Sequence, residues 1–304
     1  MHPKIAKKEA TLHIIRRFGL SLSKRLGQNF LISEQVVADI VAGAAVTAAD
    51  NVLEIGPGIG TLTQGLAESG ARVVAVELDA KLIEVLATTL AGYDNVRIVH
   101  GDILKTDISR EMSAAKYKVV ANLPYYITTP IIMALLERRL PIELLVTMVQ
   151  KEVALRMIAP PGGKDYGALS VAVQYYSDPE LLFTVPPSAF IPAPAVDSAV
   201  IRCTVRQKPP VDVADERCFF RVVKAAFGQR RKTLANALKA TGLDSRQIAA
   251  VLAAAQIDPV RRGETLSLDE FAAVANAWTN GAASTTTKSE AEVDSAEDIK
   301  VTAD

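Results

Sequence analysis

The chain has 304 residues, of which 49% are hydrophobic and 22% charged, and its formal net charge is zero. This length and composition can bury an ordinary core, arranged as one large domain and a smaller one. Cys203 and Cys218 are too far apart for a CxxC pair, and no cluster with the three histidines has metal-ligand spacing, so we expect no metal.

The first residues are basic and polar, without an apolar stretch or a cleavage site behind them. We therefore expect no secretory signal and a cytoplasmic protein. Residues 119–136 carry no charge and approach the length of a membrane span, but they contain Asn122, Pro124 and Pro130. Because these residues break a spanning helix, we predict a buried strand, a loop and a helix start, with no membrane partner.

The charges are distributed unevenly along the chain. Residues 1–25 contain seven basic residues and one acidic residue, and residues 200–265 contain thirteen basic and six acidic residues. Residues 280–304 contain two basic and six acidic residues. Basic segments on either side of an acidic middle favour a protein that holds a polyanion while its pocket takes a cationic ligand. Solvated helix faces explain the same counts equally well.

Short β-branched apolar runs alternate with helical patterns between residues 51 and 150. We predict strands at 51–55, 72–76, 95–99, 118–121 and 143–149, with helices at 65–69, 81–90 and 130–139. Strands buried on both faces read as continuous apolar runs, as these do. The alternation therefore predicts an α/β fold with a Rossmann-like parallel sheet.

The pattern changes after residue 150. We predict a helix at 151–158, strands at 181–185 and 199–205, and helices at 216–227, 233–240, 245–255 and 268–278. This gives a basic N-terminal extension with a helix at 1–23, an α/β domain at 24–207 and a small helical domain at 213–279. The tail at 280–304 has too little apolar surface to offset ordering, so we predict an acidic, disordered segment.

A glycine-rich turn directly follows the first predicted strand. Gly56, Gly58 and Gly60 permit a tight turn and a close approach of a ligand to the backbone. A GxGxG pattern alone is weak evidence, since a structural turn has the same composition. The third glycine comes one position too early for the dinucleotide pattern GxGxxG, which argues against NAD.

Two carboxylates follow the next two strands. Glu77, before Leu78, can accept hydrogen bonds from both hydroxyls of a ribose. Asp102 can accept from an adenine amino group, and the apolar Ile103 can lie against the ring. Either acid alone is explained by a solvated strand end, but three signals at successive strand ends describe an adenosyl pocket without a pyrophosphate cradle. The set is typical of class I methyltransferases.

The fourth strand ends in Asn122-Leu123-Pro124-Tyr125. Acceptors aimed at the two N–H bonds of an adenine N6 amine favour its pyramidalisation and make its lone pair nucleophilic. The Asn122 side chain and the Leu123 carbonyl can serve, with Pro124 stiffening the loop and Tyr125 stacking on the base. Phe190, in a proline-rich loop, can close the other face of a flipped base, although a packed loop phenylalanine is nearly as plausible.

Five segments then occur in a characteristic order: 24–31, 54–58, 122–125, 194–198 and 230–234. Together they resemble the ribosomal RNA adenine N6,N6-dimethyltransferase family, over about residues 11–278, and in particular its members that dimethylate two adjacent adenosines near the 3′ end of small-subunit rRNA. The resemblance implies S-adenosylmethionine as methyl donor and a partly assembled ribosomal subunit as substrate. It implies a donor site made of Gln28, Asn29, Leu31, Gly56, Gly58, Glu77, Leu78, Asp102, Ile103 and Asn122.

The erythromycin-resistance methyltransferases, which modify large-subunit rRNA, share the donor pocket and the Asn-x-Pro-Tyr loop. Gly27, Leu123 and the segment 230–236 favour the small-subunit family. Two positions depart from its usual pattern: Tyr126, where Asn is frequent, and Ala195, where a basic residue is usual. The second departure weakens one expected phosphate contact.

We expect the RNA backbone to contact Lys24, Arg25, Arg156, Arg230, Arg231 and Lys232. Such contacts position structured RNA rather than specify a base. Nothing in the sequence indicates an obligate interface, so we expect a monomer. Two further hypotheses stay open: a non-catalytic RNA-binding assembly factor on the same fold, and a DNA adenine methyltransferase.

Overall fold

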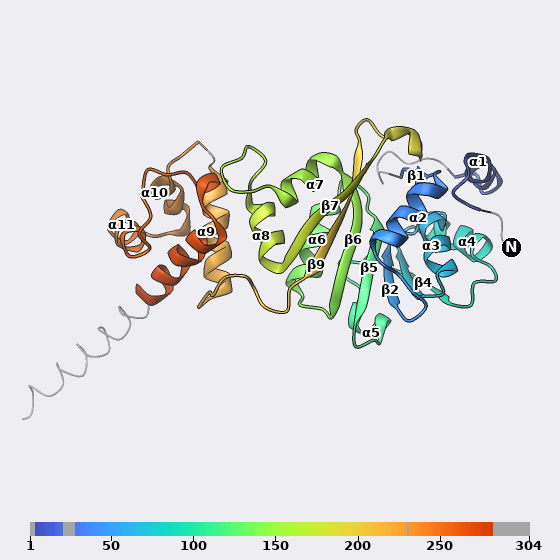
Figure 1. The fold of residues 1–304 in the computed structure, drawn as a ribbon, viewed down its shortest axis with the longest axis horizontal. Coiled ribbons are helices and arrows are strands. Elements are labelled where there is room, and N and C mark those ends of the chain that lie inside the picture. Colours follow the sequence, from blue (N-terminus) through green and yellow to red (C-terminus); the bar gives the residue numbers. More distant parts are fainter. Residues whose placement is uncertain (1–3, 21–27, 230, 282–304) are drawn as a thin grey trace, which may run out of the picture. The chain divides into compact units, whose positions relative to one another are not determined.

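The computed structural model describes residues 4–20, 28–229 and 231–281 (Figure 1). Contacts between residues divide the chain into two compact units. The first comprises Met1–Ile158 and Tyr176–Lys208, and the second comprises Ala159–Tyr175 and Pro209–Asp304. Residues 159–175 therefore group with the C-terminal helices, although they lie in the sequence between two segments of the first unit. The predicted acidic tail falls almost entirely outside the described residues.

A seven-stranded sheet forms the centre of the first unit. Its strands lie in the order β4 (Val96–His100), β3 (Arg72–Glu77), β2 (Asn51–Ile55), β5 (Tyr117–Asn122), β6 (Ile142–Gln150), β9 (Ser198–Val205) and β7 (Ser177–Val185). The first five are parallel, and β9 is antiparallel to both of its neighbours. The order confirms the predicted Rossmann-like α/β fold. From β2, the next two strands in the sequence are added on one side of the sheet and β5 and β6 on the other. Open sheets of this kind bind ligands at the carboxyl ends of the strands where the order changes side, here between β2 and β5.

The central strands are buried on both faces, as their apolar runs predicted. Val52 and Leu53 in β2 and Val119 and Val120 in β5 are fully buried. Burial on both faces removes the alternation of polar and apolar side chains, and so the runs read as continuous. The predicted strand at 181–185 begins earlier than expected, at Ser177.

Six helices of the first unit follow or precede these strands: α2 (Glu34–Gly43), α3 (Thr61–Glu68), α4 (Ala80–Thr89), α5 (Ile108–Met112), α6 (Thr128–Glu137) and α7 (Lys151–Ile158). α2 was not predicted, and the side chain of Ser33 caps it by accepting from the backbone N–H of Val36. α3 begins well before the predicted start at residue 65. Gly60 precedes it with a left-handed φ of 92°, which lets the helix begin directly after the glycine-rich turn.

One further helix and a pair of two-residue strands also belong to the first unit. α1 (Lys8–Arg17) lies in the N-terminal segment. β1 (Phe30–Leu31) pairs antiparallel with β8 (Phe190–Ile191), so that Leu31 faces Phe190 across the ladder. This pairing ties the segment before α2 to the loop before β9.

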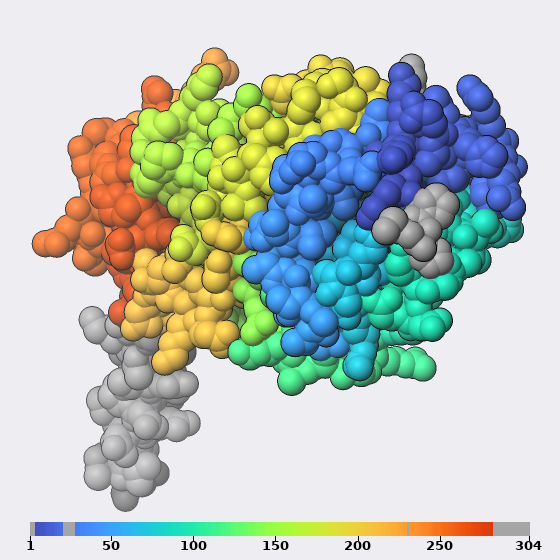
Figure 2. Space-filling model, turned by 45° about the vertical axis from the view of Figure 1, so that its right-hand side comes forward, coloured from blue at the N-terminus to red at the C-terminus, as the bar shows by residue number. Residues whose placement is uncertain are grey.

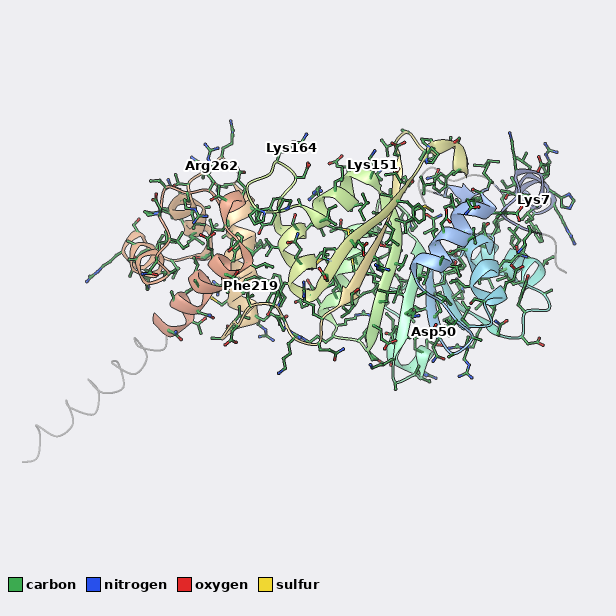
Figure 3. The ribbon with its side chains drawn as sticks, in the orientation of Figure 1. Lys7, Asp50, Lys151, Lys164, Phe219 and Arg262 are labelled. Atoms are coloured by element: carbon green, nitrogen blue, oxygen red, sulfur yellow. The ribbon has the colours of Figure 1, made fainter. Side chains whose placement is uncertain are left out.

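The second unit is helical. It contains most of α8 (Ala168–Tyr176), α9 (Glu216–Gly228), α10 (Leu234–Ala237), α11 (Ser245–Ala254), two 3-10 turns, η3 (Leu238–Thr241) and η4 (Gly263–Thr265), and a final helix at 268–281. The predicted helix at 233–240 is divided between α10 and η3. Aromatic rings build the core: Phe219, labelled in Figure 3, stacks on Tyr175 with 4.9 Å between ring centroids, and Phe227 contacts Tyr166 and Phe271.

No helix among the described residues has the length and apolar character that crossing a bilayer requires. The uncharged segment 119–136 forms the end of β5, a loop and most of α6. The strand, loop and helix start predicted there are therefore confirmed.

Candidate active site

The carboxyl ends of β2, β3, β4 and β5 meet at one edge of the sheet and enclose a cavity of about 440 Å³. The opposite edge is marked in Figure 3 by Asp50, which precedes β2, whereas Lys151 follows the carboxyl end of β6. Every predicted donor-site residue lines the cavity, as do the four loop residues: Gln28, Asn29, Leu31, Gly56, Gly58, Glu77, Leu78, Asp102, Ile103, Asn122, Leu123, Pro124 and Tyr125. Its size lies within the range of small-molecule sites.

The glycine-rich turn lines the cavity. Gly56 and Gly58 have left-handed φ angles of 66° and 61°, a conformation that residues with a side chain rarely adopt. A methyl group on Gly58 would also lie 3.4 Å from the Phe30 ring. The turn therefore requires glycine for its conformation and leaves its backbone open to a ligand.

Glu77 is held in a fixed orientation at the end of β3. Its Oε2 accepts from the backbone N–H of Gly58 at 3.2 Å, and its Oε1 accepts from the N–H of Asp79 at 2.9 Å. The side chain is 6% exposed. Burial raises the pKa of Glu77, and the N–H groups of Asp79 and Gly58 oppose the rise because they stabilise the carboxylate. Both oxygens keep lone pairs that can accept from a pair of hydroxyls.

Asp102 occupies the corresponding place after β4. Its Oδ1 accepts from the backbone N–H of Leu104 at 3.0 Å, and its Oδ2 lies 3.8 Å from the Lys105 ammonium. Ile103 beside it is buried, whereas Leu78 is 54% exposed at the rim. The arrangement combines one acceptor with apolar side chains, as binding of a flat ring with an amino group requires.

The segment around β1 covers part of the cavity. The Gln28 amide donates to Asp79 Oδ2 at 3.2 Å, which links this segment to the residue that caps α4. No role was predicted for Asp79, although an Asp directly before a helix is typical of an N-cap. The link holds Gln28 and Asn29 at the cavity wall.

The loop after β5 is fixed by both side-chain and backbone contacts. The N–H of Leu123 donates to the Met148 carbonyl at 3.2 Å, and the Thr128 hydroxyl donates to the Pro124 carbonyl at 3.0 Å. The Tyr125 hydroxyl lies 2.5 Å from Ser198 Oγ. Asn122 is thus held at the strand end by a loop that is bound on both sides.

Phe190 does not line the cavity. It is 3% exposed and belongs to the apolar cluster of Leu31, Val37 and Ile40. Its predicted contact with a target base stays a prediction. Tyr126, which sequence analysis noted only as a departure from a family pattern, is 55% exposed and lines the cavity.

Glu54 is a cavity residue to which sequence analysis gave no role. It is 1% exposed within β2, and its Oε2 has no hydrogen-bond partner in the described part of the chain. Burial raises the pKa of Glu54 to about 8, and the Glu77 carboxylate adds to the rise. The nearby Thr63 hydroxyl opposes the rise but is outweighed by burial, and it does not meet the geometric criteria for a hydrogen bond. An acid inside an otherwise apolar strand run was the signal that could have identified it.

The residues predicted to contact RNA are only partly described. Lys24, Arg25 and Arg230 lie outside the described residues. Arg156 is half-buried on α7 in the first unit, and Arg231 and Lys232 are exposed before α10 in the second unit. Their contacts with RNA stay predictions. Among the described residues, no group of three His, Cys, Asp or Glu side chains could hold a metal ion.

The strand order, with a cavity of this kind where the order changes side, defines a class I methyltransferase fold. Two solved structures share it. A dimethyladenosine transferase from Plasmodium falciparum matches with a TM-score of 0.68 and 24% identity, over 81% of this chain and 95% of that one. The 23S rRNA methyltransferase ErmE matches with a TM-score of 0.63 and 26% identity, over 83% of this chain and 100% of that one.

The sequence comparisons then define the family. A family model described as ribosomal RNA adenine dimethylase matches residues 19–278, and the chain belongs to this family. A protein named ribosomal RNA small subunit methyltransferase A from Geobacillus thermodenitrificans is 52% identical over 286 residues, which cover 91% of this chain and 98% of the relative. The protein of the same name from Clostridioides difficile is 49% identical over 278 residues, which cover 90% of this chain and 96% of the relative.

Proposed function

We propose that this protein transfers methyl groups from S-adenosylmethionine to N6 of two adjacent adenosines near the 3′ end of small-subunit rRNA, giving N6,N6-dimethyladenosines. The main observation in support of this proposal is that Glu77, Asp102 and the loop from Asn122 to Tyr125 line the same cavity. The family and its small-subunit relatives support the same substrate. We further propose a partly assembled ribosomal subunit as partner, a cytoplasmic location and a monomeric enzyme.

The cavity fits an adenosyl group by the chemistry of its lining. The oriented Glu77 carboxylate would accept from the ribose hydroxyls, and Asp102 would accept from the adenine amino group with Ile103 against the ring. Gln28, Asn29 and Leu31 would close the site from the side of β1. The open backbone at Gly56 and Gly58 would allow the remainder of the ligand to lie close to the turn.

When bound, the donor supplies an electrophilic methyl carbon on a sulfonium. The Asn122 oxygen and the Leu123 carbonyl would accept from the two N–H bonds of the target N6, which directs its lone pair toward that carbon. Tyr125 would hold the base by stacking, and Pro124 would limit the motion of the loop. Alignment of the two reacting groups supplies most of the acceleration, since no strong base is needed to remove the proton from a methylated ammonium.

The test incubates small subunits that lack the modification with radiolabelled donor and maps the label by nuclease digestion. We expect label in two adjacent adenosines near the 3′ end. Asn122→Ala should abolish transfer while donor binding is at least partly retained. Asn51→Ala, at the opposite edge of the same sheet, is the matched control and should retain full activity.

The same experiment separates the alternatives. Label in large-subunit rRNA would favour an enzyme of the erythromycin-resistance type. Binding to rRNA without incorporation of label would favour a non-catalytic assembly factor, and equal labelling of double-stranded DNA would favour a DNA methyltransferase. Normal transfer by the Asn122→Ala variant would contradict the catalytic assignment.

A further inference from the structure

The N-terminal helix α1 is firmly attached to the first unit. Ile14 on its apolar face belongs to the same buried cluster as Val85 and Leu86 of α4, with Phe18 packed against it. That cluster also contains Phe30, Ile59 and Leu82, which line the cavity. In Figure 2 the dark-blue N-terminal segment lies at the outer surface of the molecule. The helix is thus a docked element with one side facing solvent.

The cations of this segment fall into two groups. Lys4 pairs with Glu68, and Lys7, labelled in Figure 3, lies 3.7 Å from Glu34, so both bind the segment to its own unit. Lys8, Arg16 and Arg17 are exposed, and none of them has a carboxylate within ion-pair distance in the described ranges. The Arg17 guanidinium lies over the Phe18 ring at 5.5 Å, which orients it without neutralising it. Attachment of the helix does not use these three charges.

The basic end of α1 lies close to the cavity rim. The Lys81 ammonium donates to the Gly19 carbonyl at 3.1 Å, just after the end of the helix. The residues on either side of Lys81, Ala80 and Leu82, line the cavity. Arg16 and Arg17, in the last turn of α1, are therefore linked through Gly19 and Lys81 to the start of α4, where the neighbouring residues line the cavity.

We infer that Arg16 and Arg17 on α1 form a phosphate-binding surface for the RNA next to the target adenosines. This inference rests on the proposed function and adds a contact region to it. Guanidinium groups suit a phosphate backbone, since their forked donors match pairs of phosphate oxygens. The competing explanation is local: basic residues in the last turn stabilise a helix through its dipole. If that explanation is right, replacement of these residues changes the stability of the protein and leaves its affinity for RNA unchanged.

The test compares the full chain with the variant Arg16→Gln/Arg17→Gln, which keeps good helix formers at both positions. Affinity for an rRNA fragment that spans the target is measured by filter binding, without donor, at several salt concentrations. Removal of one ion pair with a phosphate lowers the slope of log affinity against log salt by about one, so we expect a decrease of about two and roughly tenfold weaker binding at low salt. The KM for the subunit should rise while kcat and donor affinity stay unchanged.

Arg110→Gln/Lys116→Gln is the matched control, because it removes two charges near the amino end of the sheet. Arg16→Lys/Arg17→Lys should restore most of the binding. An unchanged salt slope, or a lower melting temperature with unchanged RNA affinity, would overturn the inference. Since the binding assay needs no methyl transfer, failure of the proposed function would appear separately, as wild-type protein that binds the fragment and incorporates no label.

Discussion

The Tyr125 hydroxyl lies 2.5 Å from the Oγ of Ser198, a fully buried residue at the start of β9. Ser198 faces Gln150 of β6 on one side and Val185 of β7 on the other, so its position is set by two ladders of the sheet. The bond therefore connects the tip of the β5 loop to a rigid anchor. Burial raises the pKa of the Tyr125 phenol, and the bond to Ser198 opposes that rise. We take Ser198 to be a positioning residue for the ring.

Removal of the Ser198 hydroxyl should loosen the ring without disturbing the donor site. A hydrogen bond of this kind contributes about 1 kcal/mol, so Ser198→Ala should lower kcat by roughly five- to tenfold, with unchanged affinity for the demethylated donor. Tyr125→Phe removes the same bond from the other side and keeps the ring. The double variant should then be no slower than either single one, and steady-state methyl transfer measures all three. Independent, multiplying losses would show that the hydroxyls act separately.

The strands of this sheet are predictable from the sequence because burial on both faces makes each of them a continuous apolar run. The run around Val119 is apolar whichever strand lies beside it, and Gly56 and Gly58 follow β2 directly in the sequence. No local sequence pattern predicts the hydrogen bond between Tyr125 and Ser198. It joins residues 73 positions apart, and only the pairing of β9 with β6 and β7 brings them together.

Three other features of the structure also depend on conformation or on tertiary contacts. The start of α3 depends on the left-handed conformation of Gly60. A glycine permits this conformation, but its presence in the sequence does not show that the conformation is adopted. Phe190 was predicted to contact a target base, which stays a prediction, but its register opposite Leu31 and its place in an apolar cluster could not be predicted from the loop sequence. Glu54 could be noted in the sequence as an acid within an apolar strand. Its raised pKa could not be predicted, because it follows from burial by the surrounding helices and strands.

Glu77→Gln should weaken binding of the donor. The carboxylate now accepts from the N–H groups of Gly58 and Asp79, and an amide would turn its NH₂ toward one of these donors or toward the ligand. Loss of a charge-assisted bond corresponds to roughly ten- to hundredfold weaker affinity. Calorimetric titration with S-adenosylhomocysteine measures it, and Glu84→Gln, exposed on α4, is the control. Affinity within twofold of wild type would rule out Glu77 as the ribose acceptor.

Glu54 should make the folded state less stable as the pH rises. Its pKa is about 8 in the folded protein against 4.5 for an ordinary glutamate, so between these values the folded state holds a proton that the unfolded state has released. The free energy of unfolding must therefore fall across this window, by up to about 1.4 kcal/mol per pH unit from this group, and level off above pH 8. Below pH 4.5 both states are protonated and the effect disappears.

Glu54→Gln replaces the protonated carboxyl with a neutral group of the same shape and should abolish this loss. The variant and the wild type should have similar stability near pH 5, and the variant should be the more stable by a few kcal/mol near pH 8.5. Urea denaturation between pH 5 and pH 9 measures the difference, and the exposed Glu84→Gln should follow the wild-type curve. If Glu54→Gln lost stability with pH as steeply as the wild type, another group would be responsible for the loss, and the buried carboxyl of β2 would have to be ionised throughout this range.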